Sequence, residues 1–259
     1  MNVPPRPVAL VTGSARRVGR AIALELASHG HDVAVHGHRL GDEVNDTVRE
    51  LRELGVCAEA FVADLADESA CHQLLPAVAA AMGRVDAVVN NASVFEYDSV
   101  ADFSQASMAA HWRVNTAAPL LLARGLFEHL KAADRRGCVV NLLDQKLWNP
   151  NPDHLSYTLS KAALEAATTL LAQAFAPVLR VVGVAPGVTL PSGPMTDAEF
   201  ARSHAMTPLQ RASTPEDVAR AVRFLIESPA ITGTSLLVDG GQHLAAQPRD
   251  VLFLARQGA

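Results

Sequence analysis

The sequence predicts an α/β fold: a doubly wound parallel sheet of about seven strands, with helices on both faces. Short apolar runs alternate with helical patterns along the whole chain, which is the order of βαβ units. The first of these units contains a glycine-rich turn between its strand and its helix. A length of 259 residues and a hydrophobic content of 49% suit one large core. Residues 1–259 are therefore expected to form a single domain.

The first unit has the pattern of a dinucleotide-binding site. An apolar run at 8–11 leads into the loop 12–20, and an apolar-periodic helix follows until His29-Gly30. Gly13 permits a tight turn, Gly19 lets helix and strand pack closely, and the N–H groups of the helix start can receive a pyrophosphate. The usual middle glycine is replaced by Arg17. Cofactor contacts are expected from Gly13, Ser14, Arg16, Arg17, Val18 and Gly19.

The remaining elements continue the alternation. Further strands are expected at residues 32–36, 58–62, 87–89, 138–142, 181–184 and 236–238. Further helices are expected at residues 68–82, about 107–129, 157–176 and 216–226, with Pro119 able to bend the second. Two irregular segments, 145–156 and 188–211, are expected to build a substrate pocket, the second as a lid or as a surface excursion. Ligands should bind at the carboxyl ends of the strands.

The end of the second strand favours NADP(H). NAD sites usually place an acid there to hold the ribose 2′-hydroxyl, but this chain has His36-Gly37-His38-Arg39 and no acid before Asp42. Arg39 and Arg17 could hold a 2′-phosphate, although Arg39 could instead be a solvated surface charge. The two histidines, His36 and His38, have no third ligand nearby at metal-site spacing, so no metal is expected.

Tyr157 and Lys161 form the second chemical signal. If a helix begins at Tyr157, the two side chains lie on the same face, one turn apart. An ammonium beside a phenol favours the phenolate and should lower the pKa of Tyr157. Such a phenol could exchange protons near neutral pH. The spacing alone also occurs by chance on exposed helices.

These motifs together resemble the short-chain dehydrogenase/reductase family. The resemblance covers nearly the whole chain and includes the glycine-rich turn, Asn90-Asn91-Ala92, Asn115, Tyr157-x-x-x-Lys161, Pro186-Gly187 and residues 238–241. It implies that Tyr157 is the catalytic acid and that Lys161 holds the nicotinamide ribose. It also implies that Asn115 positions a water that relays protons to Lys161. Further implied cofactor contacts are Asp64, Leu65, Asn90, Asn91, Ala92, Ser93, Pro186 and Gly187.

Departures from the family pattern indicate the substrate. Most members carry a Ser thirteen residues before the Tyr, where this chain has Asp144. A carboxylate beside a ketone oxygen would oppose the negative charge that develops there, whereas a carboxyl suits the nitrogens of a heterocycle. Phe95, just past the cofactor motif, could stack on a flat ring. With Arg17, these residues resemble the pteridine reductase branch, which includes bacterial dihydromonapterin and dihydrofolate reductases. The run at 36–39 resembles the 2′-phosphate site of that branch.

The expected reaction is hydride transfer from NADPH to a pterin-type ring. Expected substrate contacts are Phe95, Ser93, Asp144, Trp148 and Tyr157, and the expected catalytic set is Tyr157, Lys161, Asp144 and Asn115. Phe95 and Trp148 could instead serve ordinary packing. One alternative function is reduction of an unrelated ketone, quinone or 3-oxoacyl thioester. Another is a non-catalytic NADP(H) sensor, against which the complete Asn115, Tyr157 and Lys161 set argues.

The composition bears on which partners and which cellular location are expected. A net charge of −5 offers no polybasic face for nucleic acid or membrane, and no apolar stretch is long enough to span a bilayer. The start lacks the apolar region of a signal peptide, and three scattered cysteines suit a reducing compartment, so a cytoplasmic location is expected. The helix at 157–176 is apolar on several faces. Such a helix must be buried, and the family resemblance implies that its outer side meets a partner subunit, so a homotetramer is expected, with a homodimer next.

Overall fold

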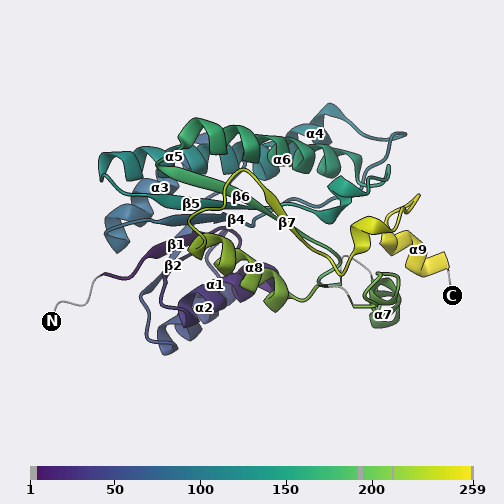
Figure 1. Cartoon of the computed structure of the whole chain (residues 1–259), viewed down its shortest axis with the longest axis horizontal. Coiled ribbons are helices and arrows are strands. Elements are labelled where there is room, and N and C mark those ends of the chain that lie inside the picture. Colours follow the sequence, from purple (N-terminus) through teal and green to yellow (C-terminus); the bar gives the residue numbers. More distant parts are fainter. Residues whose placement is uncertain (1–4, 192–194, 212, 258–259) are drawn as a thin grey trace.

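Seven parallel strands form one sheet in the order β3-β2-β1-β4-β5-β6-β7 (Figure 1). The strands are β1 (Val8–Val11), β2 (Asp32–Gly37), β3 (Ala58–Val62), β4 (Ala87–Asn90), β5 (Gly137–Leu142), β6 (Leu179–Pro186) and β7 (Ser235–Val238). The computed structural model describes residues 5–191, 195–211 and 213–257. The order reverses between β1 and β4, and such a switch point is where open α/β sheets bind ligands. The expected fold class is confirmed.

Helices cover both faces of this sheet (Figure 1). One layer contains α1 (Arg17–Ser28), α2 (Asp42–Glu53) and α8 (Pro215–Glu227). The other contains α3 (Glu68–Met82), α4 (Gln105–Trp112), α5 (Ala118–Ala132) and α6 (Leu155–Phe175). Two short helices, α7 (Asp197–Ala205) and α9 (Val251–Gln257), lie together apart from both layers. They flank the edge of the sheet where the site is built.

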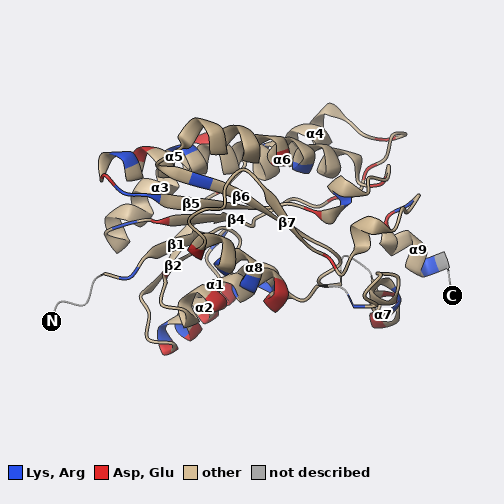
Figure 2. Cartoon of the chain, viewed as in Figure 1, with Lys and Arg blue, Asp and Glu red and all other residues tan. Residues whose placement is uncertain are grey.

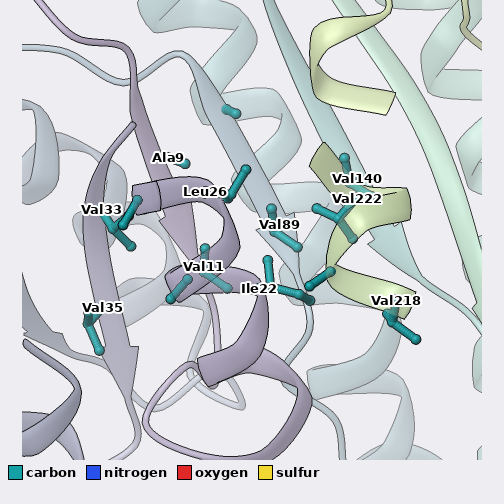
Figure 3. Packing of buried hydrophobic residues seen from close by; sticks show 14 of the residues in the cluster. Ala9, Val11, Ile22, Leu26, Val33, Val35, Val89, Val140, Val218 and Val222 are labelled. Carbon is teal, nitrogen blue, oxygen red and sulfur yellow. The ribbon is translucent and has the colours of Figure 1, made fainter. Parts of the chain in front are cut away.

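Strand β1 shows why the sheet is covered on both sides. Its side chains alternate, so Ala9 and Val11 pack against α1 and α8 while Val8 and Leu10 pack against α3 and α5. Figure 3 shows the first of these clusters, in which Ile22 and Leu26 of α1 and Val222 of α8 meet the valines of the sheet. All four β1 residues are buried. A continuous apolar run is the expected pattern for a strand with two covered faces.

Three helices, α2, α7 and α9, lie where the sequence analysis expected none. Helix α2 buries Val44, Thr47, Val48 and Leu51, a clear i, i+3, i+4, i+7 pattern. Helix α7 occupies part of the predicted loop 188–211, and Thr196 and Glu199 form a capping box at its start. Residues 192–194 of that loop lie outside the described residues.

The helix predicted at about 107–129 is divided. Helix α4 ends at Trp112, the π-helical turn η1 (Arg113–Ala117) follows, and α5 continues the chain. Pro119 has no N–H to donate to the carbonyl of Asn115 four residues earlier, which accounts for the widened turn at this point. Asn115 therefore lies inside an irregular turn that is buried. π-Helical turns of this kind are frequent at functional sites.

The charged residues of both signs are interspersed over the described surface, for example along α2 (Figure 2). Arg16, Arg20 and Arg49 each pair with an acid on α2. No helix among the described residues combines the length and the hydropathy that a membrane span requires.

Two helical glycines provide a matched test of the packing that forms the site. A Cβ on Gly19 would lie 2.3 Å from the carbonyl oxygen of Gly13, whereas a Cβ on Gly125 would meet only Leu75 at 3.8 Å. Gly19→Ala should therefore lower the free energy of unfolding by about 2 kcal/mol or more through overpacking. Gly125→Ala should raise it by about 0.5–1 kcal/mol because alanine is the better helix former. Urea unfolding of both variants measures this, and equal effects would contradict the close approach at Gly19.

Candidate active site

A glycine-rich turn joins β1 to α1 and opens a large cleft. Gly13 has a φ of +63°, which favours glycine, and Gly19 leaves no space for a side chain between the helix and the turn. Arg17, in the place of the usual middle glycine, also has a left-handed φ, of +54°. A residue with a Cβ adopts this conformation at a cost of about 1 kcal/mol. The cost is borne at a position where the guanidinium lines the cleft.

The ends of β1 and β4 are tied together beside this turn. The Asn91 side chain donates to the carbonyls of Thr12 (2.9 Å) and Gly13 (3.1 Å). The Thr12 hydroxyl accepts from the backbone N–H groups of Asn91 (2.9 Å) and Ala92 (3.0 Å). These bonds replace the strand ladder where the two strands end and diverge, so the cleft between them has fixed walls.

The cleft has a volume of about 1180 Å³ and suits an elongated anionic ligand. It is lined by most of the predicted cofactor residues: Gly13, Arg16, Arg17, Val18, Gly19, His36, His38, Arg39, Asp64, Leu65, Asn91, Ala92 and Ser93. Arg16 lies 3.6 Å from Glu43, and His38 lies 3.7 Å from Asp64. Four arginines (Arg16, Arg17, Arg39 and Arg113) and the N-terminus of α1 border a channel that also contains Asp42, Glu43 and Asp64. Phosphates would be favoured beside the arginines and the helix N-terminus. The residues present fit a phosphorylated dinucleotide.

Ser14 and His36 make structural hydrogen bonds beside the glycine turn. The Ser14 hydroxyl is buried and donates to the Val11 carbonyl (2.7 Å), and Ser14 does not line the cleft. The Nδ1 atom of His36 accepts from the Gly13 N–H (3.2 Å), and Nε2 lies 3.1 Å from the Ala63 carbonyl. Burial lowers the pKa of His36 to about 4, so the ring is neutral at pH 7. His36 thus holds the glycine turn in shape and contributes no charge to a 2′-phosphate.

Tyr157 and Asp144 meet at the carboxyl edge of the sheet. Asp144 follows β5 and Tyr157 lies in the first turn of α6, where the phenol donates to a carboxylate oxygen of Asp144 at 2.9 Å. The other carboxylate oxygen accepts from the Lys146 N–H at 2.8 Å and caps the 3₁₀ turn Gln145–Trp148. The sequence singled out both residues, and the fold brings their polar atoms into direct contact.

Lys161 lies deeper than these two groups. Its ammonium donates to the Leu142 carbonyl at 2.6 Å and lies 5.9 Å from the centre of the Tyr157 ring. Lys161 is only 3% exposed and lines neither the cleft nor the smaller cavity described below. Burial lowers the pKa of Lys161 to about 8. The residue is thus a buried cation that titrates near neutral pH.

The expectation that Lys161 lowers the pKa of Tyr157 is wrong for this structure. Burial, together with the charge and the hydrogen bond of Asp144, raises the pKa of Tyr157 well above its ordinary value. Burial likewise raises the pKa of Asp144. Burial is the largest cause, and the nearest charged group to the phenol is a carboxylate rather than the ammonium, so both effects act in the same direction. The phenol therefore keeps its proton at neutral pH, and that proton points at Asp144.

Asn115 connects the two halves of the site. Its side-chain oxygen accepts from the Val94 N–H (2.8 Å) and from the Ser93 hydroxyl (3.1 Å). Its side-chain nitrogen donates to the Val94 carbonyl (2.9 Å) and to the Ser160 hydroxyl (3.0 Å). The amide is 1% exposed and lines neither cavity, so the side chain has a positioning role. The relay of protons by water that the family resemblance implies for Asn115 remains a prediction.

A smaller cavity of about 230 Å³ lies over the Tyr157–Asp144 pair. Phe95 forms part of its wall, stacking on His154 with ring centres 4.3 Å apart and meeting Tyr157 edge-on at 4.7 Å. Pro186 and Gly187 line this cavity and not the large cleft. Arg17 lines both and marks the place where they join. The cavity therefore offers an aromatic wall, a phenol and a carboxyl to a small ligand.

Two predicted substrate residues do not line the smaller cavity. Trp148 ends the 3₁₀ turn, is 38% exposed and lines neither space. Ser93 lines the large cleft only. Gln145 and Lys146 line the smaller cavity and belong to the segment 145–156, which was expected to build a substrate pocket. Asp250 also lines this cavity and was missed. Asp250 carries no local signal, because only the fold brings it near residue 146.

The neutral His36 ring provides a pH test of the glycine turn. Protonation would turn Nδ1 into a donor and abolish the bond from Gly13. Because the pKa falls from 6.5 unfolded to about 4 folded, the stabilisation is complete above pH 6.5 and is lost as the pH falls towards 4. The total loss should be about 3 kcal/mol. Urea unfolding at pH 7 and pH 5 should show a shallower pH dependence for His36→Gln, with the exposed His38→Gln as control. An unchanged slope in His36→Gln would contradict this account.

Comparisons with known proteins agree with this arrangement. A family model described as enoyl-(acyl carrier protein) reductase matches residues 13–243. The structure of FolM alternative dihydrofolate reductase 1 from Brucella canis, complexed with NADP, is 40% identical and superposes with a TM-score of 0.87. It covers 94% of this chain and 97% of its own. Pteridine reductase 1 of Leishmania tarentolae is 31% identical over 93% of this chain and 98% of its own length.

A further relative has a different stated substrate. The putative ketoacyl reductase 2 of the granaticin polyketide synthase from Streptomyces violaceoruber is 34% identical, covering 94% of this chain and 98% of its own length. Two relatives are named as short-chain enzymes: the short chain dehydrogenase mdpC of Emericella nidulans (30% identical) and the short chain dehydrogenase/reductase AacuN of Aspergillus aculeatus (31% identical), each covering 90% of this chain. The family model spans the glycine turn, Asn115, Tyr157 and Lys161. This chain is a member of the short-chain dehydrogenase/reductase family and an oxidoreductase.

Proposed function

We propose that the protein is an NADPH-dependent reductase of a pterin-type ring, such as a dihydropterin, dihydromonapterin or dihydrofolate. The observation that carries the proposal is the Tyr157 phenol bonded to the Asp144 carboxylate in a cavity walled by Phe95. The similarity to the NADP complex of an alternative dihydrofolate reductase and to a pteridine reductase supports it. The whole chain would act as one NADP(H)-binding domain, with residues 188–211 as the substrate loop.

The residues of the small cavity suit proton delivery to a ring nitrogen. NADPH, when bound, supplies the hydride. Burial keeps the Tyr157 proton in place, and Asp144 orients the phenol through the 2.9 Å bond. The same carboxylate can accept a hydrogen bond from a ring N–H. It can also return a proton to the phenol after the phenol has protonated the ring. Phe95, fixed by His154, would hold a flat ring in position by stacking.

A carbonyl substrate suits this site less well. Reduction of a ketone places negative charge on its oxygen, and that charge needs donors and cations within reach. Here the nearest group to the phenol is a buried carboxylate, which would oppose the charge. A ring nitrogen that gains a proton presents an N–H, and a carboxylate stabilises it. The relative named as a ketoacyl reductase makes carbonyl reduction the second candidate.

Support for NADP(H) rather than NAD comes from the part of the large cleft that directly follows β2. His38 and Arg39 line it directly after β2, where NAD sites usually place an acid. Arg16 and Arg17 add positive charge at the glycine turn. Two structures of FolM proteins from Brucella, each 40% identical to this chain, were determined with NADP. Since His36 is neutral, Arg39 is the residue we propose for the 2′-phosphate.

A homotetramer is proposed, with a homodimer as the next simplest assembly. Leu159 and Leu170 of α6 are 49% and 63% exposed, and Met108 and Trp112 of α4 are also exposed. These exposed apolar side chains lie on two helices that contact each other, and exposed apolar patches are typical of subunit contacts. A cytoplasmic location is also proposed, and the free thiols of Cys57, Cys71 and Cys138 support it.

Tyr157→Phe should remove the proton donor and leave the cleft intact. Turnover of a dihydropterin should fall by about 100-fold or more, which is the usual contribution of a general acid. NADPH affinity, measured by fluorescence titration, should change little because the large cleft is lined by other residues. Turnover close to that of the unaltered protein would exclude the phenol as the acid.

Asp144→Ser tests the substrate class. NADPH oxidation should be followed with a panel of dihydropterins and, separately, with ketones, quinones and 3-oxoacyl thioesters. The unaltered protein should reduce a dihydropterin best, and the substitution should lower that rate by about 100-fold while carbonyl reduction stays equal or improves. Asp102→Asn, at an exposed acid outside both cavities, is the control. Preferred reduction of a carbonyl by the unaltered protein would instead establish the second candidate.

A further inference from the structure

We infer that Asp250 and the side-chain amide of Gln145 form an acceptor edge that selects substrate rings with adjacent N–H donors. The 2-amino-4-oxopyrimidine half of a pterin is such a ring. The inference rests on the proposed function and adds two specificity-determining residues to it. Both residues line the small cavity that also contains Asp144 and Tyr157.

Gln145 presents an unsatisfied acceptor. Its side-chain oxygen is buried and has no hydrogen-bond partner among the described residues, and the residue as a whole is 8% exposed. A buried amide oxygen without a partner costs about 1–3 kcal/mol. Gln145 directly follows Asp144 and lines the same cavity. This oxygen is not open to the cavity in the unliganded arrangement. A bound ring would satisfy it with an N–H group once the Gln145 side chain turns towards the ring.

The Asp250 carboxylate can accept further hydrogen bonds. One carboxylate oxygen accepts from the Leu252 N–H at 3.1 Å, and the other lies 3.6 Å from the Lys146 ammonium. A carboxylate has about four acceptor positions, so those not used here can serve a ligand. Lys146, whose side chain is 4% exposed, balances the charge and allows the carboxylate to stay in a largely covered position.

A clamp centred on Asp153 fixes Asp250 in place. The Asp153 carboxylate accepts from the Arg249 guanidinium at 2.8 and 3.0 Å and from the Asp250 N–H at 2.7 Å. The Lys146 ammonium donates to the Asp153 carbonyl, and the Lys146 N–H donates to Asp144. The C-terminal segment is thereby tied to the loop that carries the catalytic carboxyl. Asp250 and Asp144 have a defined relative position before any substrate arrives.

The chemistry of this wall discriminates between the two candidate substrates. A 2-amino-4-oxopyrimidine ring offers an amino group and a ring N–H side by side, and both can be donated to Asp250 and Gln145. A simple ketone or quinone presents only acceptors, which would face acceptors here and leave them unpaired. Unpaired buried polar groups are the strongest source of discrimination between similar ligands. The wall therefore selects the amino-bearing ring.

The test compares 7,8-dihydropterin with its 2-deamino analogue. In NADPH-coupled kinetics, Asp250→Asn should raise the KM for dihydropterin by about 10- to 100-fold, because a charged acceptor is lost. The KM for the deamino ring should change by less than about threefold. Gln145→Leu should act in the same direction with a smaller effect. NADPH affinity and urea unfolding show whether a variant is otherwise intact.

Glu199→Gln is the matched control. Glu199 pairs with Arg256 between α7 and α9, on the same side of the molecule, but lines neither cavity. It should leave the ratio of the two KM values unchanged. Equal effects of Asp250→Asn on both rings would overturn the inference while the proposed function stands. If the unaltered protein reduces carbonyls and no dihydropterin, the proposed function fails and the inference fails with it.

Discussion

The side-chain amide of Asn115 is the interaction on which both halves of the site depend. Its four hydrogen bonds join the segment after β4, which borders the large cleft, to Ser160, which lies between Tyr157 and Lys161 on α6. The amide reaches both partners from an irregular π-helical turn. A polar group this deeply buried is tolerated only when its bonds are complete, so both partners are held in a single arrangement.

Much of the fold followed from the sequence because periodicity and glycine chemistry are local. The apolar runs gave the strands within a residue or two, and the continuous apolar run of β1 is visible in the chain itself. Helices α2, α7 and α9 were not predicted, although two of them carry readable signals. Val44, Thr47, Val48 and Leu51 mark α2 at helical spacing, and Thr196 with Glu199 marks the start of α7.

The site was predictable in its residues but not in its electrostatics. Tyr157, Asp144 and Phe95 were identified from spacing and from the family resemblance, and the fold brings them together. The direction of the Tyr157 pKa depends on which charged group is nearest and on burial, and neither can be read from the interval between two residues. Asp250 is brought to the cavity only by the path of the chain after β7, so no pattern announces it.

Helix α6 carries residues of the site on one face and an exposed apolar surface on the other. Its buried face carries Tyr157, Ser160 and Lys161, while its outward face presents Leu159, Ala162, Ala166 and Leu170 to solvent. In the proposed assembly, a neighbouring subunit resting on the outer face would hold the helix in place, and with it Tyr157, the proposed proton donor on the inner face. Catalytic competence would then scale with protein concentration, and dilution would loosen the geometry of the site before it unfolded the chain.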